Sequence, residues 1–225
     1  MIDFKALFKI TYGLYVVSSG DKIRGNGFIS NTVFQVTSEP AVFAASCNKK
    51  NFTCQLIEKT GRFAVTVLHP QTDPEIISKF GYKSGSDFNK LSGMDVKYGE
   101  TGVPIILNGG IAYLECNVIQ KIDVGTHWLF IGELMNAQLL DDSKDPLTYA
   151  FYRQVLKGVA PKNAPTYIDP SKFETKQEPT KSGRHRCTLC GHIHDDSVED
   201  TKFDDLPKNW VCPVCSAEKE FFTEI

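Results

Sequence analysis

Runs of β-branched and aromatic residues recur through the first two thirds of the chain, with polar or glycine-containing turns between them. Runs of this length and composition are typical of β-strands. The predicted strands cover residues 12–18, 41–46, 62–68, 111–119 and 127–134. Several short strands with few helices favour a mainly β fold, a β-barrel or sandwich, over a doubly wound α/β sheet.

Helical spacing of apolar residues is clear in only two places. Residues 52–59 place apolar side chains one turn apart and are followed by Gly61 as a stop signal. Pro146 suits the first turn of a second helix that continues to Leu156. The pattern therefore predicts a mainly β domain with a few accessory helices.

The segment 159–183 carries four prolines and no sustained apolar period. This composition is typical of an extended linker. The chain therefore divides into a first domain over residues 1–158, a linker over 159–183 and a C-terminal module over 184–225. A module of roughly 40 residues cannot fold on the burial of its own core alone.

Composition narrows the class of protein. The 225 residues are 41% apolar and 23% charged, as in ordinary globular proteins, and no apolar run approaches the ~18 residues of a membrane span. With a net charge of -2 and no basic run, the chain lacks a surface that neutralises nucleic-acid phosphates. The N-terminal residues carry no small-residue cleavage site, so we expect a cytoplasmic location.

Four of the seven cysteines form two Cys-x-x-Cys pairs near the end of the chain. Without an export signal, such clustering indicates a metal site before disulfides. Four thiolates select zinc or iron, and the ligands alone do not decide between them. A zinc ion that only holds the small module together is therefore an open alternative to a redox metal. The predicted ligands are Cys187, Cys190, Cys212 and Cys215.

The residues around these cysteines form further motifs. A glycine follows Cys190, Phe-Asp-Asp-Leu-Pro occupies 203–207, and Asn-Trp-Val-Cys-Pro-Val-Cys occupies 209–215. In these features the segment 184–225 resembles a rubredoxin. The resemblance implies one iron ion on the four cysteines, which carries single electrons. It also implies a small aromatic core, which would consist of Phe203, Trp210 and Phe222.

The module departs from the rubredoxin pattern at four positions. His185, His192 and His194 stand where rubredoxins usually carry tyrosines, and Ser216 replaces a common glycine after the last ligand. Because four thiolates already fill a tetrahedral shell, we expect the histidines at the surface or at the edge of the core and not on the metal.

The first domain contains three motifs, at residues 26–38 (NGFISNTVFQVTS), 46–49 (SCNK) and 125–133 (GTHWLFIGE). They resemble the flavin reductase family, close to its ferric reductase and high-molecular-weight rubredoxin branch, and the resemblance covers residues 1–167. It implies a split β-barrel, usually a homodimer, that binds FMN or FAD without a Rossmann fold. The order of flavin domain, linker and rubredoxin is similar to that of high-molecular-weight rubredoxins.

Polar and small residues of these motifs are the candidates for flavin binding. Lys49, at the start of the helix that follows Asn48, would offer positive charge beside free N–H groups to a phosphate, and Thr53 would add a hydroxyl. From the residues alone the polar set reads as turns between strands, whereas the resemblance assigns it to the flavin. The candidates are Asn26, Gly27, Phe28, Asn31, Thr32, Ser46, Cys47, Asn48, Lys49, Phe52 and Thr53.

His127 is the candidate catalytic residue. A single histidine beside an apolar strand is usually a satisfied core residue, but the resemblance implies a position near the flavin and the nicotinamide. The segment 25–30 (GNGFIS) lacks the third glycine and the following helix of a dinucleotide fingerprint, so no Rossmann site is expected.

Together the two resemblances imply an electron-transfer oxidoreductase. NAD(P)H would bind transiently and reduce FMN, which would pass electrons to the Fe(Cys)4 centre and on to an acceptor such as a flavodiiron oxygen or nitric oxide reductase. Two alternatives stay open: a flavin or ferric reductase with a structural zinc knuckle, and a passive electron carrier. The absence of a triad or paired-carboxylate motif agrees with flavin chemistry, which needs no protein nucleophile.

Overall fold

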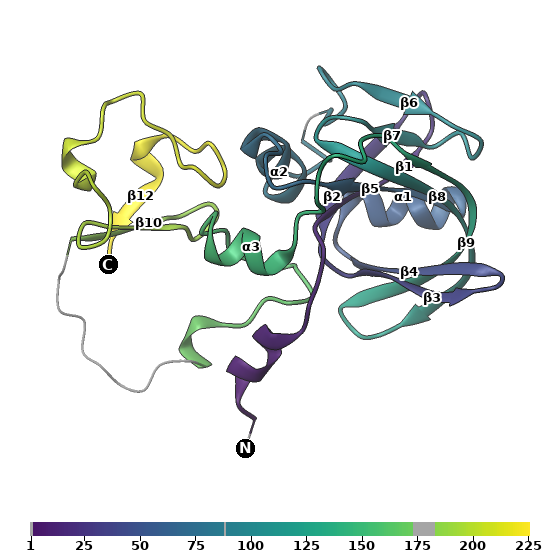
Figure 1. Ribbon diagram of the computed structural model, residues 1–225, viewed down its shortest axis with the longest axis horizontal. Helices are drawn as coiled ribbons and strands as arrows, with labels where there is room; N and C mark the ends of the chain where they lie inside the picture. Colours follow the sequence, from purple (N-terminus) through teal and green to yellow (C-terminus); the bar gives the residue numbers. More distant parts are fainter. Residues whose placement is uncertain (1, 88, 173–182) are drawn as a thin grey trace.

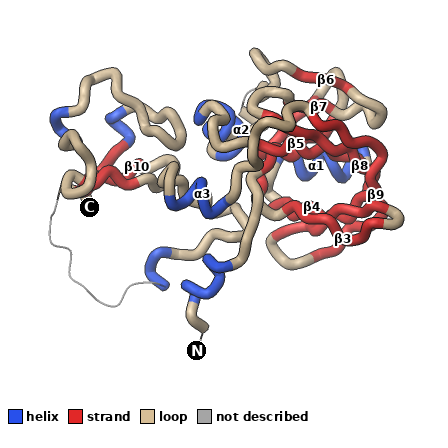
Figure 2. The backbone as a smooth tube through the Cα atoms, viewed as in Figure 1, coloured by secondary structure: helices blue, strands red, loops and turns tan. Residues whose placement is uncertain are grey.

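An antiparallel sheet of seven strands in the order β2-β1-β5-β8-β9-β4-β3 forms the larger part of the molecule (Figure 1). The computed structural model describes residues 2–87, 89–172 and 183–225. The sheet curves around the helix α1 (Phe52–Thr60), and α1 packs against β1 and β2 (Figure 2). The strands are β1 Tyr15–Gly20, β2 Gly25–Ser30, β3 Val33–Ser38, β4 Ala41–Asn48, β5 Arg62–Leu68, β8 Gly110–Asp123 and β9 His127–Leu139.

Each predicted strand overlaps an observed one, so the mainly β fold class is confirmed. The sequence pattern missed β2 and β3, because glycine and asparagine open β2 and because β3 is exposed over most of its length. It also missed a short hairpin, formed by β6 (Val96–Tyr98) and β7 (Pro104–Ile106). No helix in the described ranges is long and apolar enough to cross a membrane.

The helix α1 ends at the predicted Gly61, but it begins at Phe52, so Lys49 lies in the turn before the helix and not at its start. Asn51 caps it, since its side chain accepts a hydrogen bond of 2.9 Å from the Thr53 N–H. Gly61 ends it in the left-handed conformation with φ of 65°, and its N–H donates to the Ile57 carbonyl at 2.8 Å. The buried face of the helix then fills the interior of the curved sheet.

The helix predicted to begin at Pro146 is shorter than expected. The observed α3 covers Tyr149–Gln154, and Thr148 is its N-cap. Leu147 lies before the helix, and its N–H donates to the Leu68 carbonyl at 2.7 Å. A further helix, α2 (Pro74–Gly81), was missed although Asp73 and Pro74 form a usual helix start.

The C-terminal module is built on a three-stranded sheet, β11-β10-β12. These strands are β10 Arg184–Cys187, β11 Ile193–Asp195 and β12 Phe222–Glu224, with 3-10 turns η3 (Phe203–Asp205) and η4 (Lys219–Phe221). The predicted aromatic core is confirmed: ring centroids lie 5.9 Å apart for Phe203 and Trp210, and 5.2 Å apart for Trp210 and Phe222.

Two histidines lie deeper in this module than expected. His192 and His194 are only 3% and 5% exposed, so the expectation of surface or core-edge positions is wrong for them. His194 packs edge-on against the Phe203 and Trp210 rings, and its Nε2 lies 2.9 Å from the Thr201 carbonyl. His185 stacks on Phe203 with centroids 4.1 Å apart. The imidazoles therefore replace the expected tyrosines as members of the aromatic core.

The predicted linker contacts the rest of the molecule over the part that is described. Val159 and Ala160 pack against a buried cluster that spans α2, α3 and the four cysteines. A 3-10 turn, η2 (Pro170–Lys172), follows, and residues 173–182 of the predicted linker lie outside the described residues. At the other end of the chain, η1 (Phe4–Lys9) lies against this region.

Candidate functional site

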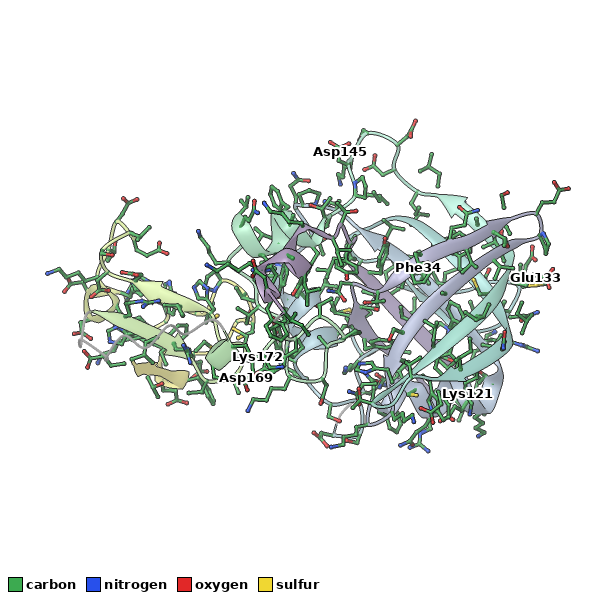
Figure 3. All side chains as sticks on the ribbon, turned by 90° about the horizontal axis from the view of Figure 1, so that it is seen from below. Phe34, Lys121, Glu133, Asp145, Asp169 and Lys172 are labelled. Atoms are coloured by element: carbon green, nitrogen blue, oxygen red, sulfur yellow. The ribbon has the colours of Figure 1, made fainter. Side chains whose placement is uncertain are left out.

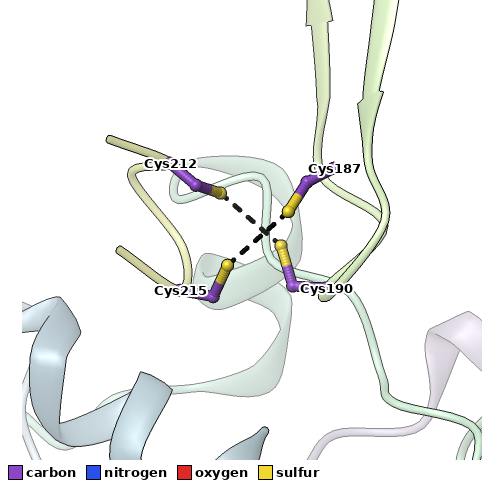
Figure 4. A group of neighbouring side chains, drawn as sticks. All are labelled: Cys187, Cys190, Cys212 and Cys215. Carbon is purple, nitrogen blue, oxygen red and sulfur yellow. Dashed lines mark hydrogen bonds between the residues drawn. The ribbon is translucent and has the colours of Figure 1, made fainter. Parts of the chain in front are cut away.

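Four cysteine sulfurs converge in the C-terminal module, at its edge against α2 and α3 (Figure 4). The Sγ atoms of Cys187 and Cys215 lie 3.6 Å apart, those of Cys190 and Cys212 lie 3.5 Å apart, and all four lie within 4.8 Å of one another. A tetrahedral ion with metal–sulfur bonds of about 2.3 Å has sulfur–sulfur distances of about 3.8 Å. The donor set therefore fits a single tetrahedral metal ion.

The two pairs sit on matching backbone turns. In the first, the Gly191 N–H donates to the Cys187 carbonyl at 2.8 Å; in the second, the Ser216 N–H donates to the Cys212 carbonyl at 2.8 Å. Gly191 has φ of 77° and Ser216 has φ of 56°, so both occupy the left-handed region. This explains why glycine is the common residue at position 216: serine adopts the same turn at a cost of about 1 kcal/mol.

The cluster perturbs its own thiols. The pKa of Cys187 is lowered, because the thiols of Cys190, Cys212 and Cys215 surround it and donate to its sulfur. A thiolate is the form that binds a metal.

Beside this cluster lies a cavity of about 300 Å³. Strand β2 contributes Phe28, the start of α1 contributes Phe52, and the end of α2 contributes Phe80 and the loop that follows it. Segment 159–165 closes one side. Aromatic and aliphatic walls with a few polar groups are what a planar ring cofactor requires.

The structure brings together five of the predicted flavin residues in the cavity wall: Phe28, Asn31, Ser46, Asn48 and Phe52. Asn26 lies behind them at 2% exposure, where its Oδ1 accepts from the Gly27 N–H at 2.8 Å and from the Thr53 hydroxyl at 3.3 Å. Gly27 is packed against Phe80, so a larger side chain there would press on that ring.

The other predicted residues lie further from the cavity. Lys49 forms a salt bridge of 2.6 Å with Asp123 and lies 4.3 Å from the Trp128 ring centroid. The Thr32 hydroxyl donates to the side chain of Asn31 at 3.0 Å. Cys47 is 1% exposed within the core. None of these three lines the cavity within the described residues.

Four lysines line the cavity: Lys50, which follows the predicted Lys49, and three that the sequence reasoning missed, Lys83, Lys90 and Lys162. Lys90 is only 2% exposed, and its Nζ donates to the Gly27 carbonyl at 3.1 Å and to the Phe80 carbonyl at 3.3 Å. Burial lowers the pKa of Lys90 to about 8. The signal for Lys83 and Lys90 was the turn-rich segment after the unpredicted α2, in which these two lysines flank serines and a glycine.

His127 lies in the wall behind the cavity and is 8% exposed. Its Nδ1 lies 2.8 Å from the Thr126 hydroxyl, and its Nε2 lies 3.1 Å from the Asn163 carbonyl. Asn163 itself lines the cavity. In this arrangement the imidazole holds segment 159–165 against β9.

The cavity and the metal cluster share a wall. Leu189, which stands between the ligands Cys187 and Cys190, lines the cavity. The Ser78 hydroxyl on α2 donates to the Cys215 carbonyl, and Gly191 lies against Val159. The elements α2 and α3 thus lie between the curved sheet and the metal module (Figure 1).

A pair of tyrosines ties these helices together at the same place. The Tyr82 and Tyr152 hydroxyls lie 2.7 Å apart, and the Tyr82 hydroxyl also donates to the Val159 carbonyl at 2.8 Å. Burial raises the pKa of Tyr82, and the neighbouring Tyr152 raises it further. Both rings therefore stay neutral and keep their hydrogen bonds at physiological pH.

Known proteins match both parts of the chain. A flavin reductase like domain is matched over residues 7–157, and a rubredoxin over residues 184–222. The high molecular weight rubredoxin of Moorella thermoacetica is 39% identical, with all of both chains covered. The chain belongs to the high molecular weight rubredoxin family.

Two further proteins match only part of the chain. A ferric-chelate reductase (NAD(P)H) of Archaeoglobus fulgidus is 42% identical over 75% of this chain and 99% of its own. The solved NADH:FAD oxidoreductase SgcE6 of Streptomyces globisporus C-1027 is similar in fold, with a TM-score of 0.58 and 23% identity over 64% of this chain and 84% of its own. With the cluster of four cysteines, these matches support a flavin and an iron in an oxidoreductase of the high molecular weight rubredoxin type.

Proposed function

We propose that the protein is an NAD(P)H-dependent oxidoreductase that holds FMN in the cavity and iron on Cys187, Cys190, Cys212 and Cys215. A bound flavin would take two electrons from NAD(P)H and release them one at a time to the iron. The proposed domain boundaries follow: a flavin domain over 1–158, a connecting segment over 159–183 and an iron module over 184–225. We place the protein in the cytoplasm.

The cavity suits FMN in shape and charge. Phe28 and Phe52 provide apolar walls, and Asn31 and Ser46 offer polar groups to the edge of an isoalloxazine ring. The lining lysines supply the positive charge that a phosphate needs. Asn26, Gly27, Thr32, Cys47 and Thr53 would support these residues from behind. The predicted roles of Lys49 and His127 remain part of this proposal, with His127 acting through the wall at Asn163.

One observation carries the electron-transfer assignment: Leu189 of the first cysteine turn lines the cavity proposed for the flavin. A zinc ion that served only to hold the module together would not need to face that cavity. The hydrogen bond from Ser78 to the Cys215 carbonyl holds the second turn at the same interface. The flavin, as electron donor, and the iron, as electron acceptor, would therefore lie close together within one chain.

An exposed apolar surface supports the proposed homodimer. Phe34 and Val36 on β3 are 51% and 48% exposed, and Ile119 on β8 and Met135 on β9 are 57% and 45% exposed. Figure 3 shows Phe34 on the outer side of the curved sheet, away from the metal module. Association through this face would bury these side chains and leave the metal module free on the other side.

The external acceptor would meet the iron module. Residues 184–225 carry five basic and nine acidic residues, so their net charge is 5 minus 9, or -4, and the rest of the chain is +2. We propose a redox protein with a basic docking surface, such as a flavodiiron protein, as the acceptor.

An anaerobic titration of the purified protein with NADH or NADPH tests this function. Flavin and ferric-thiolate absorption should both be present, and both should bleach as the reductant is added. A protein that holds zinc, with no ferric band, would be a flavin or ferric reductase with a structural knuckle. A protein with both bands that NAD(P)H leaves unchanged would be a passive carrier. Either result would contradict the proposal.

A further inference from the structure

A second cavity, of about 400 Å³, lies beside the first and has no assigned role. It is bounded by η1, by α3 and by the segment 165–172, whose Lys172 is labelled in Figure 3. Its described walls contain no aspartate or glutamate. Instead they contain three cations, Lys9, Arg153 and Lys172, and five aromatic residues, Phe4, Phe8, Tyr12, Tyr149 and Tyr167.

Arg153 is the central cation. Its guanidinium carbon lies 3.5 Å from the Phe8 ring centroid and 5.9 Å from that of Tyr149. A guanidinium stacked on a ring keeps its N–H edge free for a planar or anionic partner. Within the described residues it forms no ion pair.

Lys172 adds charge on the opposite wall, and its Nζ lies 4.7 Å from the Phe4 ring centroid. Asp169 lies three residues before Lys172, and its carboxylate interacts electrostatically with that lysine. Asp169 does not line the wall, and its carboxylate accepts from the Ser171 N–H at 3.0 Å. The cavity is therefore cationic and aromatic at once, which matches a phosphorylated aromatic compound.

The second cavity adjoins the one proposed for the flavin. Tyr149 and Pro165 line both cavities. Between them, Asn31 of the first cavity donates to the Thr166 hydroxyl of the second at 2.7 Å. Because the two cavities share lining residues, a ligand that has an aromatic ring at each end could extend from one cavity into the other.

We propose that this second cavity binds the adenosine-phosphate end of a dinucleotide whose other end lies at the flavin cavity. Arg153 and Lys172 hold the phosphates, and the aromatic walls take the adenine. The inference rests on the proposed function, because the dinucleotide would be NAD(P)H when FMN is the cofactor. If the cofactor were FAD, the same cavity would hold the adenosine phosphate of FAD.

The test compares two reductants on the flavin-loaded full chain. Reduced nicotinamide mononucleotide lacks the adenosine phosphate that NADH carries. In Arg153→Ala the ratio of KM for NADH to KM for the mononucleotide should rise about tenfold, the effect of losing one good charged contact. Arg153→Lys, which keeps the charge but loses the planar stack, should fall between. Lys5→Ala, on η1 but outside the cavity wall, should leave the ratio unchanged.

Direct binding separates this inference from the proposed function. ADP-ribose carries no redox group, so its affinity, measured by calorimetry, tests the cavity even if NADH does not reduce the flavin. Weaker binding of ADP-ribose to Arg153→Ala than to wild type supports the binding of NAD(P)H in this cavity. If Arg153→Ala retains FMN but loses FAD, and the KM ratio is unchanged, the cavity holds the adenosine phosphate of FAD. If neither changes, or if the variant only alters the oligomeric state because a second copy covers η1, the proposal is overturned.

Discussion

The curved sheet and the metal module are stabilised by different interactions. The sheet encloses a large core in which Phe63 and Phe130 are almost fully buried. The module has only a small cluster of rings, and the four cysteines lie at its edge against α2 and α3. Loss of one ion should therefore unfold the module, whereas the sheet depends on packing distributed over many residues.

The two regions also differ in how their sites are encoded. The metal ligands come in two pairs with fixed local spacing, so the four positions could be named from the sequence. The flavin cavity draws on β2, β4, the start of α1, the loop after α2 and segment 159–165, which are far apart along the chain. Short motifs mark only part of a site assembled in this way, because the residues of the loop after α2 and of segment 159–165 belong to none of them.

The largest expected effect is that of Cys212→Ser. Removing one ligand should abolish the metal chromophore and unfold residues 184–225, because ligation holds so small a module together. The flavin should stay bound to the first domain. Absorption spectra, circular dichroism and limited proteolysis measure these outcomes. Ser216→Gly, in the same turn, is the matched control and should keep the metal, since it relieves the left-handed serine.

Phe63→Ala is the converse experiment. Phe63 is fully buried on β5, so truncation should lower the free energy of unfolding of the first domain by roughly 3–5 kcal/mol. The ferric-thiolate spectrum should persist beyond the unfolding of the first domain in denaturant. Simultaneous loss of both signals would show that the two regions unfold as one unit.

Sequence reasoning succeeded where the physical signal is local. The end of α1 at Gly61, the strands with β-branched runs and the two cysteine turns could all be predicted. It failed where tertiary contacts determine the local structure. Leu147 is hydrogen-bonded to Leu68 just before the start of α3, and no periodicity in the sequence reveals that contact.

The same limit applies to charged and polar site residues. Lys49 belongs to a predicted flavin motif, yet Asp123, distant in sequence, holds its ammonium group. Lys90 lies outside any recognised motif, yet the backbone of β2 and α2 buries it beside the cavity. Such partners are set by the fold and not by spacing.

The buried Lys90 predicts a pH dependence of the first domain without flavin. Burial lowers the pKa of Lys90 from 10.5 to about 8. Between these values the unfolded chain binds more protons than the folded one, so the stability of the folded state rises with pH in that window. The contribution approaches roughly 3 kcal/mol by pH 10.5. Chemical denaturation of wild type and Lys90→Met across pH 7 to 11 should show this rise only in wild type.

The smallest expected effect concerns the interface between the two regions. Tyr82→Phe and Tyr152→Phe should each lower stability by about 1 kcal/mol, and the double variant should show a coupling of roughly 0.5–1.5 kcal/mol, because each change removes the same hydrogen bond. Chemical denaturation of wild type, the two single variants and the double variant completes this double-mutant cycle. Strictly additive effects would mean that the two hydroxyls do not interact.

The most direct test of the central claim is the rate at which the iron is reduced after a light pulse has reduced the flavin. If electrons pass across the wall at Leu189 within one assembled protein, the rate constant of iron bleaching should stay the same over a tenfold range of protein concentration. A rate constant that rises in proportion to protein concentration would contradict the account, because electrons would then pass only between separate molecules.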